Sequence, residues 1–289
     1  MHLLFELLTL ACNLCDYRLR RMSRFLLFPF ALLLVCNIGH TQGVRIGNTL
    51  VVSQPTLNKS VNSDAFQSFI FKEILPALNE ENQELLFNLF RADRGNQKDA
   101  FLLVGTTGKI EKPKAAHIKS PLSIAETKGI QRINEFVSNP ETFTEYRLVG
   151  WQEIKTLPTS GILGIHSIQV KKKRAKQFEE FVVDKLHPAV SQLLPDMQLL
   201  YFKAVGGENV GSYITIFTID SPEARDKYWP GGASETEILR KTFKPLEGLA
   251  KELETYLVEG SYLEPQSGGA AAYWESKIWT DYILMHPTK

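Results

Sequence analysis

The sequence has very little cysteine. Only three of its 289 residues are cysteines, at Cys12, Cys15 and Cys36, and all three precede Gly43. A chain beginning near that glycine would have no disulfide, no thiol nucleophile and no thiolate metal site. It would still be long enough to fold around a hydrophobic core without covalent cross-links.

Several catalytic and binding signatures are missing as well. The six histidines form no H-x-H or H-x-x-x-H pattern, so we predict no metal site. The sequence has no G-x-S-x-G motif of the hydrolases. GTTGK at 105–109 and GGENVGS at 206–212 lack the spacing or the lysine of a phosphate-binding loop. The formal net charge is only +1, which gives no electrostatic reason to expect a nucleic-acid partner.

The N-terminal region has the pattern of a secretory signal. Arginines in the stretch 18–24 precede the apolar run FLLFPFALLLV at 25–35, which is too short for a membrane span of about 20 residues. Met22 is a better start for such a signal than Met1. We expect residues 1–42 to be a signal region cleaved near Gln42, although lipidation at Cys36 stays open. The mature chain would then be periplasmic or secreted, with no membrane segment.

An internal repeat organises the rest of the chain. FQSFIFKEILPAL at 66–78 returns as FEEFVVDKLHPAV at 178–190, and the offset between the copies is 178 − 66 = 112. Both copies have apolar residues at helical spacing. Matching residues in the segments 84–106 and 198–218 keep this offset, and both segments read as a strand, a glycine-containing turn and a second strand, which predicts a β-hairpin. Pro76 and its counterpart are expected to kink or end the repeated helix.

The flanking segments complete each repeat. Short strands are predicted before each helix, from NTLVVSQ at 48–54 and ILGIHSIQV at 162–170. A second helix is predicted after each hairpin, from KGIQRINEFV at 128–137 and FKPLEGLAKELETYL at 243–257. Each copy ends on a strand, FTEYRLV or WTDYILM, at 143–149 and 279–285. The second copy carries extra residues before that strand, a flexible loop from PQSGGAAA and a further strand from YWESKI.

The order β-α-β-β-α-β is the ferredoxin-like motif, whose sheet has helices on one face only. Two copies in one chain can bury their open faces against each other, which predicts a barrel. We therefore divide the mature chain into a first repeat at 43–158 and a second repeat at 159–289, and expect a monomer.

This arrangement resembles the dimeric α/β-barrel superfamily, which includes antibiotic-biosynthesis-type monooxygenases and EthD-like and NIPSNAP-like proteins. The resemblance covers about residues 46–289 and rests on the topology and on the F-x-x-F…P-A helix. It implies an α+β fold in which two tandem ferredoxin-like βαββαβ repeats form an intramolecular dimeric α/β barrel. Some members of this superfamily bind haem through one histidine. His187 or His166 could serve here, although we predict no cofactor.

Both hairpins retain a cation beside aromatic residues. Strand alternation places Arg91 on one stripe of the first hairpin, and Lys203 with Tyr201 on the matching stripe of the second; Tyr213 begins a similar stripe on the next strand. If these stripes line the barrel, its cavity would be aromatic with a cation in each half. Such a cavity suits a flat organic acid or a phenolic ligand. The alternative is that both cations lie at the rim and reach water.

Four further residues complete the tentative ligand-binding set. Tyr228 and Trp229 lie in ARDKYWPGG at 224–232, either at the mouth of a cavity or packed in the core. His187 precedes the helix proline of the second repeat. His166 is on its first strand, opposite Gln54 of the first repeat.

The final strands repeat an acidic residue. Glu145 and Asp281 occupy matching positions, offset by 281 − 145 = 136. In the superfamily this strand often reaches across to the partner domain. Asp281 could then meet Arg91, and Glu145 could meet Lys203, as ties between the two halves.

Three functions remain open at this point. The leading hypothesis is an exported protein that binds a small, partly aromatic ligand in the barrel between its repeats. The alternatives are a cofactor-independent, monooxygenase-like enzyme, in which the barrel would exclude water, and a structural exported protein with a filled barrel. Bulky apolar residues closing the centre of the barrel would favour the last of these.

Overall fold

The computed structural model describes most of the predicted repeat region. The described residues are 44–81, 85–95, 97, 99–107, 121–122, 132–150, 156–158, 161–194, 197–229, 241, 244–258 and 279–287. The chain divides into two compact units, 1–42 and 43–289, and every described residue belongs to the second. The predicted signal region, the loop at 265–272 and the strand at 273–278 lie outside the described residues. No helix in the described ranges is long and apolar enough to cross a membrane.

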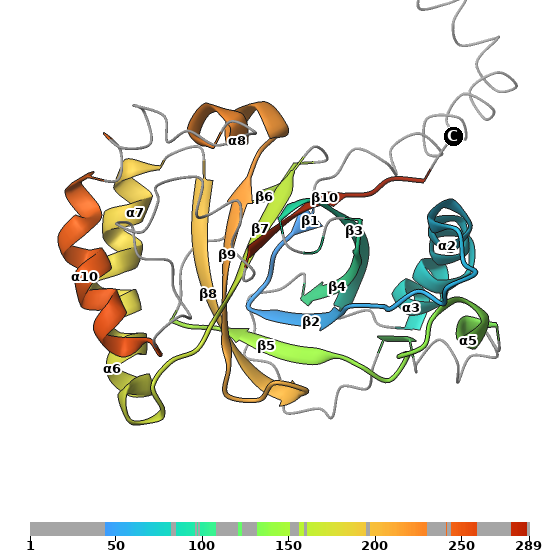
Figure 1. Ribbon diagram of the computed structural model, residues 1–289, viewed down its shortest axis with the longest axis horizontal. Helices are drawn as coiled ribbons and strands as arrows, with labels where there is room; N and C mark the ends of the chain where they lie inside the picture. Colours follow the sequence, from blue (N-terminus) through green and yellow to red (C-terminus); the bar gives the residue numbers. More distant parts are fainter. Residues whose placement is uncertain are drawn as a thin grey trace, which may run out of the picture. The chain divides into compact units, whose positions relative to one another are not determined.

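Eight antiparallel strands close into a barrel, which confirms the predicted fold class (Figure 1). The order around the barrel is β10-β3-β4-β2-β5-β8-β9-β7. The first repeat supplies β2 (Thr49–Ser53), β3 (Leu85–Gly95), β4 (Phe101–Thr107) and β5 (Thr144–Leu148). The second repeat supplies β7 (Ile162–Ile168), β8 (Met197–Gly207), β9 (Tyr213–Ile219) and β10 (Trp279–Leu284).

The last strand of each repeat reaches across to the other repeat, as expected. Strand β5 pairs with β8, and β10 pairs with β3. These two pairings, the β5–β8 seam and the β10–β3 seam, join the halves and are related by the internal repeat. Each seam contains an irregularity at the same place, between Glu145 and Tyr146 in one and between Asp281 and Tyr282 in the other.

The helices of each repeat cover the outer face of its own sheet (Figure 1). The first repeat has α2 (Ser63–Phe69), η2 (Ile70–Ile74), α3 (Leu75–Glu81) and α5 (Ile133–Phe136). The second has η3 (Lys172–Arg174), α6 (Ala175–Phe181), η4 (Val182–Leu186), α7 (His187–Leu193), α8 (Pro222–Tyr228), η5 (Lys244–Leu246) and α10 (Glu247–Tyr256).

The repeated helix does not end at its proline. In both copies a five-residue π-helical segment, η2 or η4, lies just before Leu75-Pro76 or His187-Pro188, and the helix then continues as α3 or α7. A proline lacks the amide N–H and its ring clashes with the carbonyl one turn earlier. The wider π turn moves that carbonyl away. The two helices therefore bypass the proline with the same device.

The interior of the barrel is filled. All eight strands send large apolar side chains into one cluster, among them Leu50, Phe90, Leu200 and Phe202, which are no more than 1% exposed. A short antiparallel pair outside the barrel, β1 (Val44–Arg45) with β6 (Thr156–Leu157), adds Val44, Ile46 and Leu157 to the same cluster. A ligand-sized cavity would leave the side chains that line it partly uncovered. The described interior residues are instead in close mutual contact.

Candidate functional site

The aromatic and cationic stripes lie on the outer face of the barrel and not on the inner one. On β8, Leu200 and Phe202 belong to the interior cluster, whereas Leu199 and Tyr201 pack under the helices of the second repeat. Strand alternation puts Lys203 on that outer side as well. In the first repeat Phe87 and Leu89 pack under the helices, which places Arg91 outside. The condition that these stripes line a central cavity is therefore not met.

The four stripe residues have partners on this outer face. The Nζ atom of Lys203 donates to Glu179 Oε1 at 2.8 Å, and the Tyr213 hydroxyl donates to the same oxygen at 2.6 Å. Arg91 forms an ion pair with Asp99 at 2.9 Å and is 36% exposed. Tyr201 is buried, with its ring centroid 5.6 Å from that of His187. The cations thus reach solvent at the edge of the helical layer.

Both candidate histidines are buried in the outer layer of the second repeat. His187 is 7% exposed, and its Nε2 atom has no hydrogen-bond partner within the ranges that the structure describes; His166 is 3% exposed. Burial disfavours the charged imidazolium and lowers the pKa of each to about 4. Register also corrects one alignment. His166 pairs with Thr215, and Ser53 pairs with Leu103. Because Thr215 and Leu103 are counterparts at the repeat offset of 112, the counterpart of His166 is Ser53 and not Gln54.

A haem group does not fit beside His187 within the described part of the chain. The orphaned Nε2 atom of His187 has the chemistry of an axial ligand. However, the side chains around it, including Leu186, Val190 and Tyr201, are at most 5% exposed and belong to one packed cluster. A porphyrin needs a pocket of several hundred Å³ next to that nitrogen. We therefore assign no haem chemistry to this site.

Tyr228 and Trp229 pack against the outer face of the second repeat. Tyr228 is 4% exposed and belongs to the helix-covered cluster. Trp229 follows α8, and its ring centroid lies 6.0 Å from that of Phe217 on β9. The described contacts of these two aromatic residues favour packing in the core over a position at the mouth of a cavity.

The repeated acids do not pair as predicted. In register, Asp281 lies opposite Arg94, while Arg91 lies opposite Ile283. Asp281 forms its ion pair with Arg225 at 3.1 Å. In the other seam Glu145 lies opposite Gly206 and contacts Arg147 at 3.4 Å. The two predicted pairings are wrong because Arg91 and Lys203 face Ile283 and Arg147, each two positions beyond the acid on its strand. The bulge in each seam adds one more residue to that separation.

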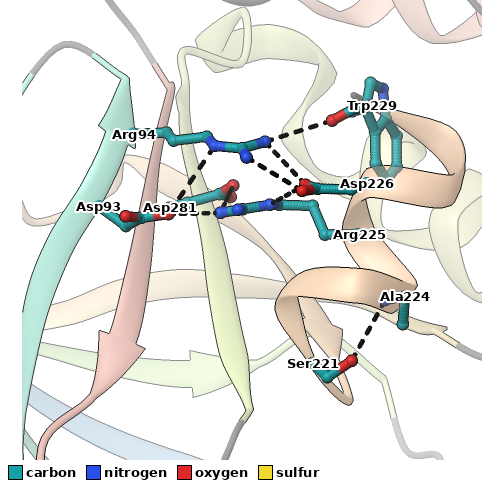
Figure 2. A network of polar contacts seen from close by, with 8 residues as sticks. All are labelled: Asp93, Arg94, Ser221, Ala224, Arg225, Asp226, Trp229 and Asp281. Atoms are coloured by element: carbon teal, nitrogen blue, oxygen red, sulfur yellow. Dashed lines mark hydrogen bonds and ion pairs between the residues drawn. The ribbon is translucent and has the colours of Figure 1, made fainter. Parts of the chain in front are cut away.

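A tie between the halves nevertheless exists, and it runs through α8 (Figure 2). The Nη1 atom of Arg225 donates to Asp93 at 2.8 Å and to Asp281 at 3.1 Å. Arg94 donates to both carboxylate oxygens of Asp226, at 2.8 and 3.2 Å. Asp93 and Arg94 belong to β3 of the first repeat, whereas Arg225 and Asp226 belong to α8 of the second. In each of these two contacts, a base of one repeat binds an acid of the other. We call these five residues the seam cluster.

The bulge on β3 makes this exchange geometrically feasible. Tyr282 lies opposite Ala92 and Asp281 opposite Arg94, so Asp93 is the extra residue of the bulge. A bulge leaves two consecutive residues opposite one and re-aims their side chains. Figure 2 shows both Asp93 and Arg94 directed at α8. On α8, the hydroxyl of the N-cap residue Ser221 accepts from Ala224 N at 3.2 Å, which fixes the start of the helix.

Asp281 is the least ordinary member of the seam cluster. It is 0% exposed, and burial raises its pKa to about 7 even though the Arg225 guanidinium acts to lower it. Its Oδ2 atom accepts from Arg225, whereas its buried Oδ1 atom has no partner among the described residues. A buried carboxylate oxygen without a donor carries a large desolvation cost. Such a group is a candidate for binding or proton transfer.

Sequence reasoning missed Arg225, Asp226, Asp93 and Arg94. The segment 224–232 stood out for its aromatic residues and not for its Arg-Asp dipeptide. The signal that could have identified it is the complementary dipeptide Asp93-Arg94, 132 positions earlier, next to the repeated acid. Only the seam register shows that these two dipeptides meet.

Comparisons with known proteins add only distant likenesses. No family model matches the sequence, and no curated protein matches it. Similar solved structures include a dye-decolorizing protein from V. cholerae, with 9% identity, a TM-score of 0.46, and 83% of this chain and 94% of that chain covered. A heme-binding protein from Thermus thermophilus has 10% identity, a TM-score of 0.44 and coverage of 86% and 93%. A monooxygenase-like protein from Lactobacillus acidophilus has 10% identity, a TM-score of 0.43 and coverage of 82% and 92%.

The strand order of the barrel itself is stronger ground than these likenesses. Two βαββαβ repeats, joined by exchange of their last strands across two seams, form one closed barrel. The chain therefore has the dimeric α/β-barrel fold, with both halves in one polypeptide.

Proposed function

We propose that this protein binds a small organic molecule on the outer face of its second repeat, at the β10–β3 seam. The barrel would serve as a rigid, filled scaffold for that site. The observation that carries the proposal is the buried Asp281, whose Oδ1 atom has no partner in the described part of the chain although Arg225 holds its other oxygen.

The internal repeat supplies a control for this interpretation. Both seams have the same strand pairing and the same bulge, so any group needed only to close the barrel should occur in both. The β5–β8 seam has Val205 and Gly206 where the β10–β3 seam has Asp93 and Arg94. Its acid, Glu145, contacts the partly exposed Arg147 and, among the residues described, no buried arginine. Closure therefore does not require the seam cluster, which supports a separate role for it.

Native mass spectrometry of the full-length protein tests the proposal. We expect the wild-type protein, purified without detergent, to carry an additional mass of a few hundred daltons. Arg94→Met should lose that mass, because Arg94 flanks Asp281 and holds Asp226 of α8 in place. Arg91→Met is the matched control, since Arg91 is on the same strand but pairs with Asp99 outside the cluster.

Two results would count against this proposal. If Arg94→Met and Arg91→Met retain the additional mass equally, the site is elsewhere. If the wild-type protein carries no additional mass and no aromatic compound raises its melting temperature, the structural alternative with a filled barrel is favoured instead.

A second function is supported by one specific property of Asp281. A carboxyl group with a pKa near 7 can accept a proton from a substrate hydroxyl at neutral pH. The monooxygenase-like alternative would need such a base. Oxygen consumption with a bound phenolic compound, lost in Asp281→Asn, would support the enzyme; binding without any oxygen consumption would support the non-catalytic role.

We also propose that the mature protein functions outside the cytoplasm. Support comes from the arginine-rich stretch and the apolar run before residue 36. Sequencing the N-terminus of the protein recovered from an export compartment tests this, and we expect it near Gly43. An intact N-terminus on a cytoplasmic protein would refute it.

A further inference from the structure

Basic residues gather where the chain enters α6 of the second repeat, and all of them are exposed. They are Lys171, Lys172, Lys173, Arg174 and Lys176. We call this group the basic turn. Lys176 lies 3.6 Å from Glu180, and no other member forms an ion pair within the described part of the chain. The basic turn therefore presents a concentrated positive charge to solvent, although the whole protein carries only +1.

Two members of the basic turn are held by the end of α10 without losing their charge. The Nζ atom of Lys171 donates to the carbonyl oxygen of Thr255 at 3.0 Å. The guanidinium of Arg174 lies 5.0 Å from the ring centroid of Tyr256. Neither partner is an anion, so these contacts fix the position of the turn and leave its charges available to an external partner.

The internal repeat shows that this helix does not need cations at its start. The matching helix of the first repeat is capped by Asn62, whose side chain accepts from the amide of Asp64 at 2.7 Å. At the offset of 112, Arg174 and Lys176 take the places of Asn62 and Asp64. Among the described residues, the start of α6 has no side-chain cap, and it has cations where the helix dipole favours acids. Both differences lower stability, which favours a role outside folding.

An exposed apolar residue lies beside the basic turn. The amide of Val258 donates to the carbonyl of Gln169 at 2.8 Å, and the amide of Lys171 donates to the carbonyl of Tyr256 at 2.9 Å. The two segments therefore run side by side. Val258 is 39% exposed and adds an apolar contact next to the cations. Proteins that bind a membrane surface combine these two features, positive charge and an adjoining apolar side chain.

From these observations we propose that the basic turn docks the second repeat on an anionic phospholipid surface. Clusters of about four to eight basic residues bind such surfaces, and each cation near the surface strengthens binding about fivefold. The ammonium groups contact the lipid phosphates, and Val258 enters the headgroup layer. This is peripheral docking, in which no segment crosses the bilayer.

A nucleic acid matches this surface less well. Single strands are bound through exposed aromatic side chains on which the bases stack. Tyr256, on which Arg174 lies, is only 8% exposed and offers no such platform. A phosphate backbone also has no apolar layer for Val258, whereas a lipid surface has one.

The basic turn and the seam cluster lie at opposite ends of the second repeat. Figure 1 shows the start of α6 at the lower end of this repeat and α8 at the upper end. Docking through the basic turn would thus leave α8 on the side away from the lipid. The inference goes beyond the proposed ligand site and does not depend on it.

Cosedimentation of the full-length protein with vesicles tests the inference. Phosphatidylcholine vesicles with phosphatidylglycerol provide the anionic surface, and vesicles without it provide the neutral one. The wild type should bind the anionic vesicles at least about tenfold more tightly. The double variant Lys172→Gln/Lys173→Gln should lose at least about tenfold of this affinity, because two cations are removed. Its binding to neutral vesicles should not change, since the apolar run at 25–35 is the same in every variant.

The double variant Lys59→Gln/Lys72→Gln is the matched control, because it removes the same charge from exposed positions of the first repeat. Its affinity for anionic vesicles should stay within about twofold of the wild type. At about 1 M salt the effect of Lys172→Gln/Lys173→Gln should disappear, because the Debye length is then about 3 Å. Circular dichroism establishes that each variant is folded.

Two results with vesicles would overturn the inference. One is equal affinity of the wild type for neutral and anionic vesicles, and the other is an equal loss of affinity in the two double variants. Binding of an oligonucleotide that requires Lys172 and Lys173, without binding of anionic vesicles, would also overturn it and would assign the basic turn to nucleic acid instead.

Discussion

Asp281 combines full burial, one strong partner and one unpaired oxygen. Residues of this kind are rare because a buried carboxylate loses its hydrogen bonds to water. Neighbouring donors must replace those bonds to offset the desolvation free energy. Arg225 recovers part of that cost, and burial still raises the Asp281 pKa to about 7. A ligand that donates to Oδ1 would recover more. Asp281 thus lowers the stability of the fold, and in the proposed function a ligand would supply the missing hydrogen bond.

The raised pKa predicts a specific dependence of stability on pH. The folded protein holds the Asp281 proton more tightly than the unfolded chain, whose aspartate titrates near the ordinary value of 3.8. The contribution of Asp281 to the free energy of unfolding should therefore decrease as pH rises from about 4 to about 7, by at most about 1.4 kcal/mol per pH unit. Above pH 7 no further loss is expected.

Urea unfolding of the wild type and of Asp281→Asn, measured at several pH values, tests this directly. The stability of the wild type relative to Asp281→Asn should decline across that pH window, because asparagine does not titrate. A relative stability that is constant with pH, or that rises, would contradict the assignment.

Among the elements of the fold, the most predictable are those within a repeat. Apolar spacing and glycine turns were enough to predict the repeated helix, both hairpins and both final strands. The sequence did not show which face of the hairpins lines the barrel, since both faces of β3 and β8 carry apolar residues. It also did not reveal α8 as a bridge, because its role depends on a bulge in a strand of the other repeat.

The bridge formed by α8 predicts coupling between two residues far apart in sequence. In a double-mutant cycle, Arg94→Met and Asp226→Asn should cost less together than the sum of their separate effects, with a coupling of about 1 kcal/mol. The pair is bidentate but partly exposed, which limits the value. Hydrogen exchange of the α8 amides should accelerate in both single variants.

The pair Arg91–Asp99 serves as the comparison for that cycle. It has one 2.9 Å contact within the first repeat and is more exposed. Its coupling should be smaller, and its removal should leave exchange in α8 unchanged. Equal coupling in the two pairs, with no effect on α8, would show that the seam cluster does not hold the helix.

At the scale of the whole molecule, the two repeats share one closed barrel but differ at their two seams. Two similar halves close one barrel, and the interior is packed with side chains from every strand. The duplication was readable from the sequence, because its offset is constant over more than one element. The difference between the two seams could not be read from the sequence, because it lies in a few residues that come into contact only in the observed strand register.

A filled interior predicts a large cost for removing one of its rings. Phe202→Ala should lower the free energy of unfolding by about 3–5 kcal/mol, because Phe202 is completely buried at the centre of the interior cluster. Val210→Ala, on an exposed hairpin tip at 64% exposure, should change it by no more than about 0.5 kcal/mol. Chemical denaturation measures both, and a loss below about 1 kcal/mol for Phe202→Ala would indicate an open interior.

We propose that the ligand site lies outside the barrel, at the β10–β3 seam. A crystal structure of the wild-type protein with its small molecule bound is the measurement to make first. We expect electron density for the ligand at this seam, within hydrogen-bond distance of Asp281 Oδ1. Density inside the barrel, among Leu50, Phe90 and Phe202, would show that the proposed site is wrong.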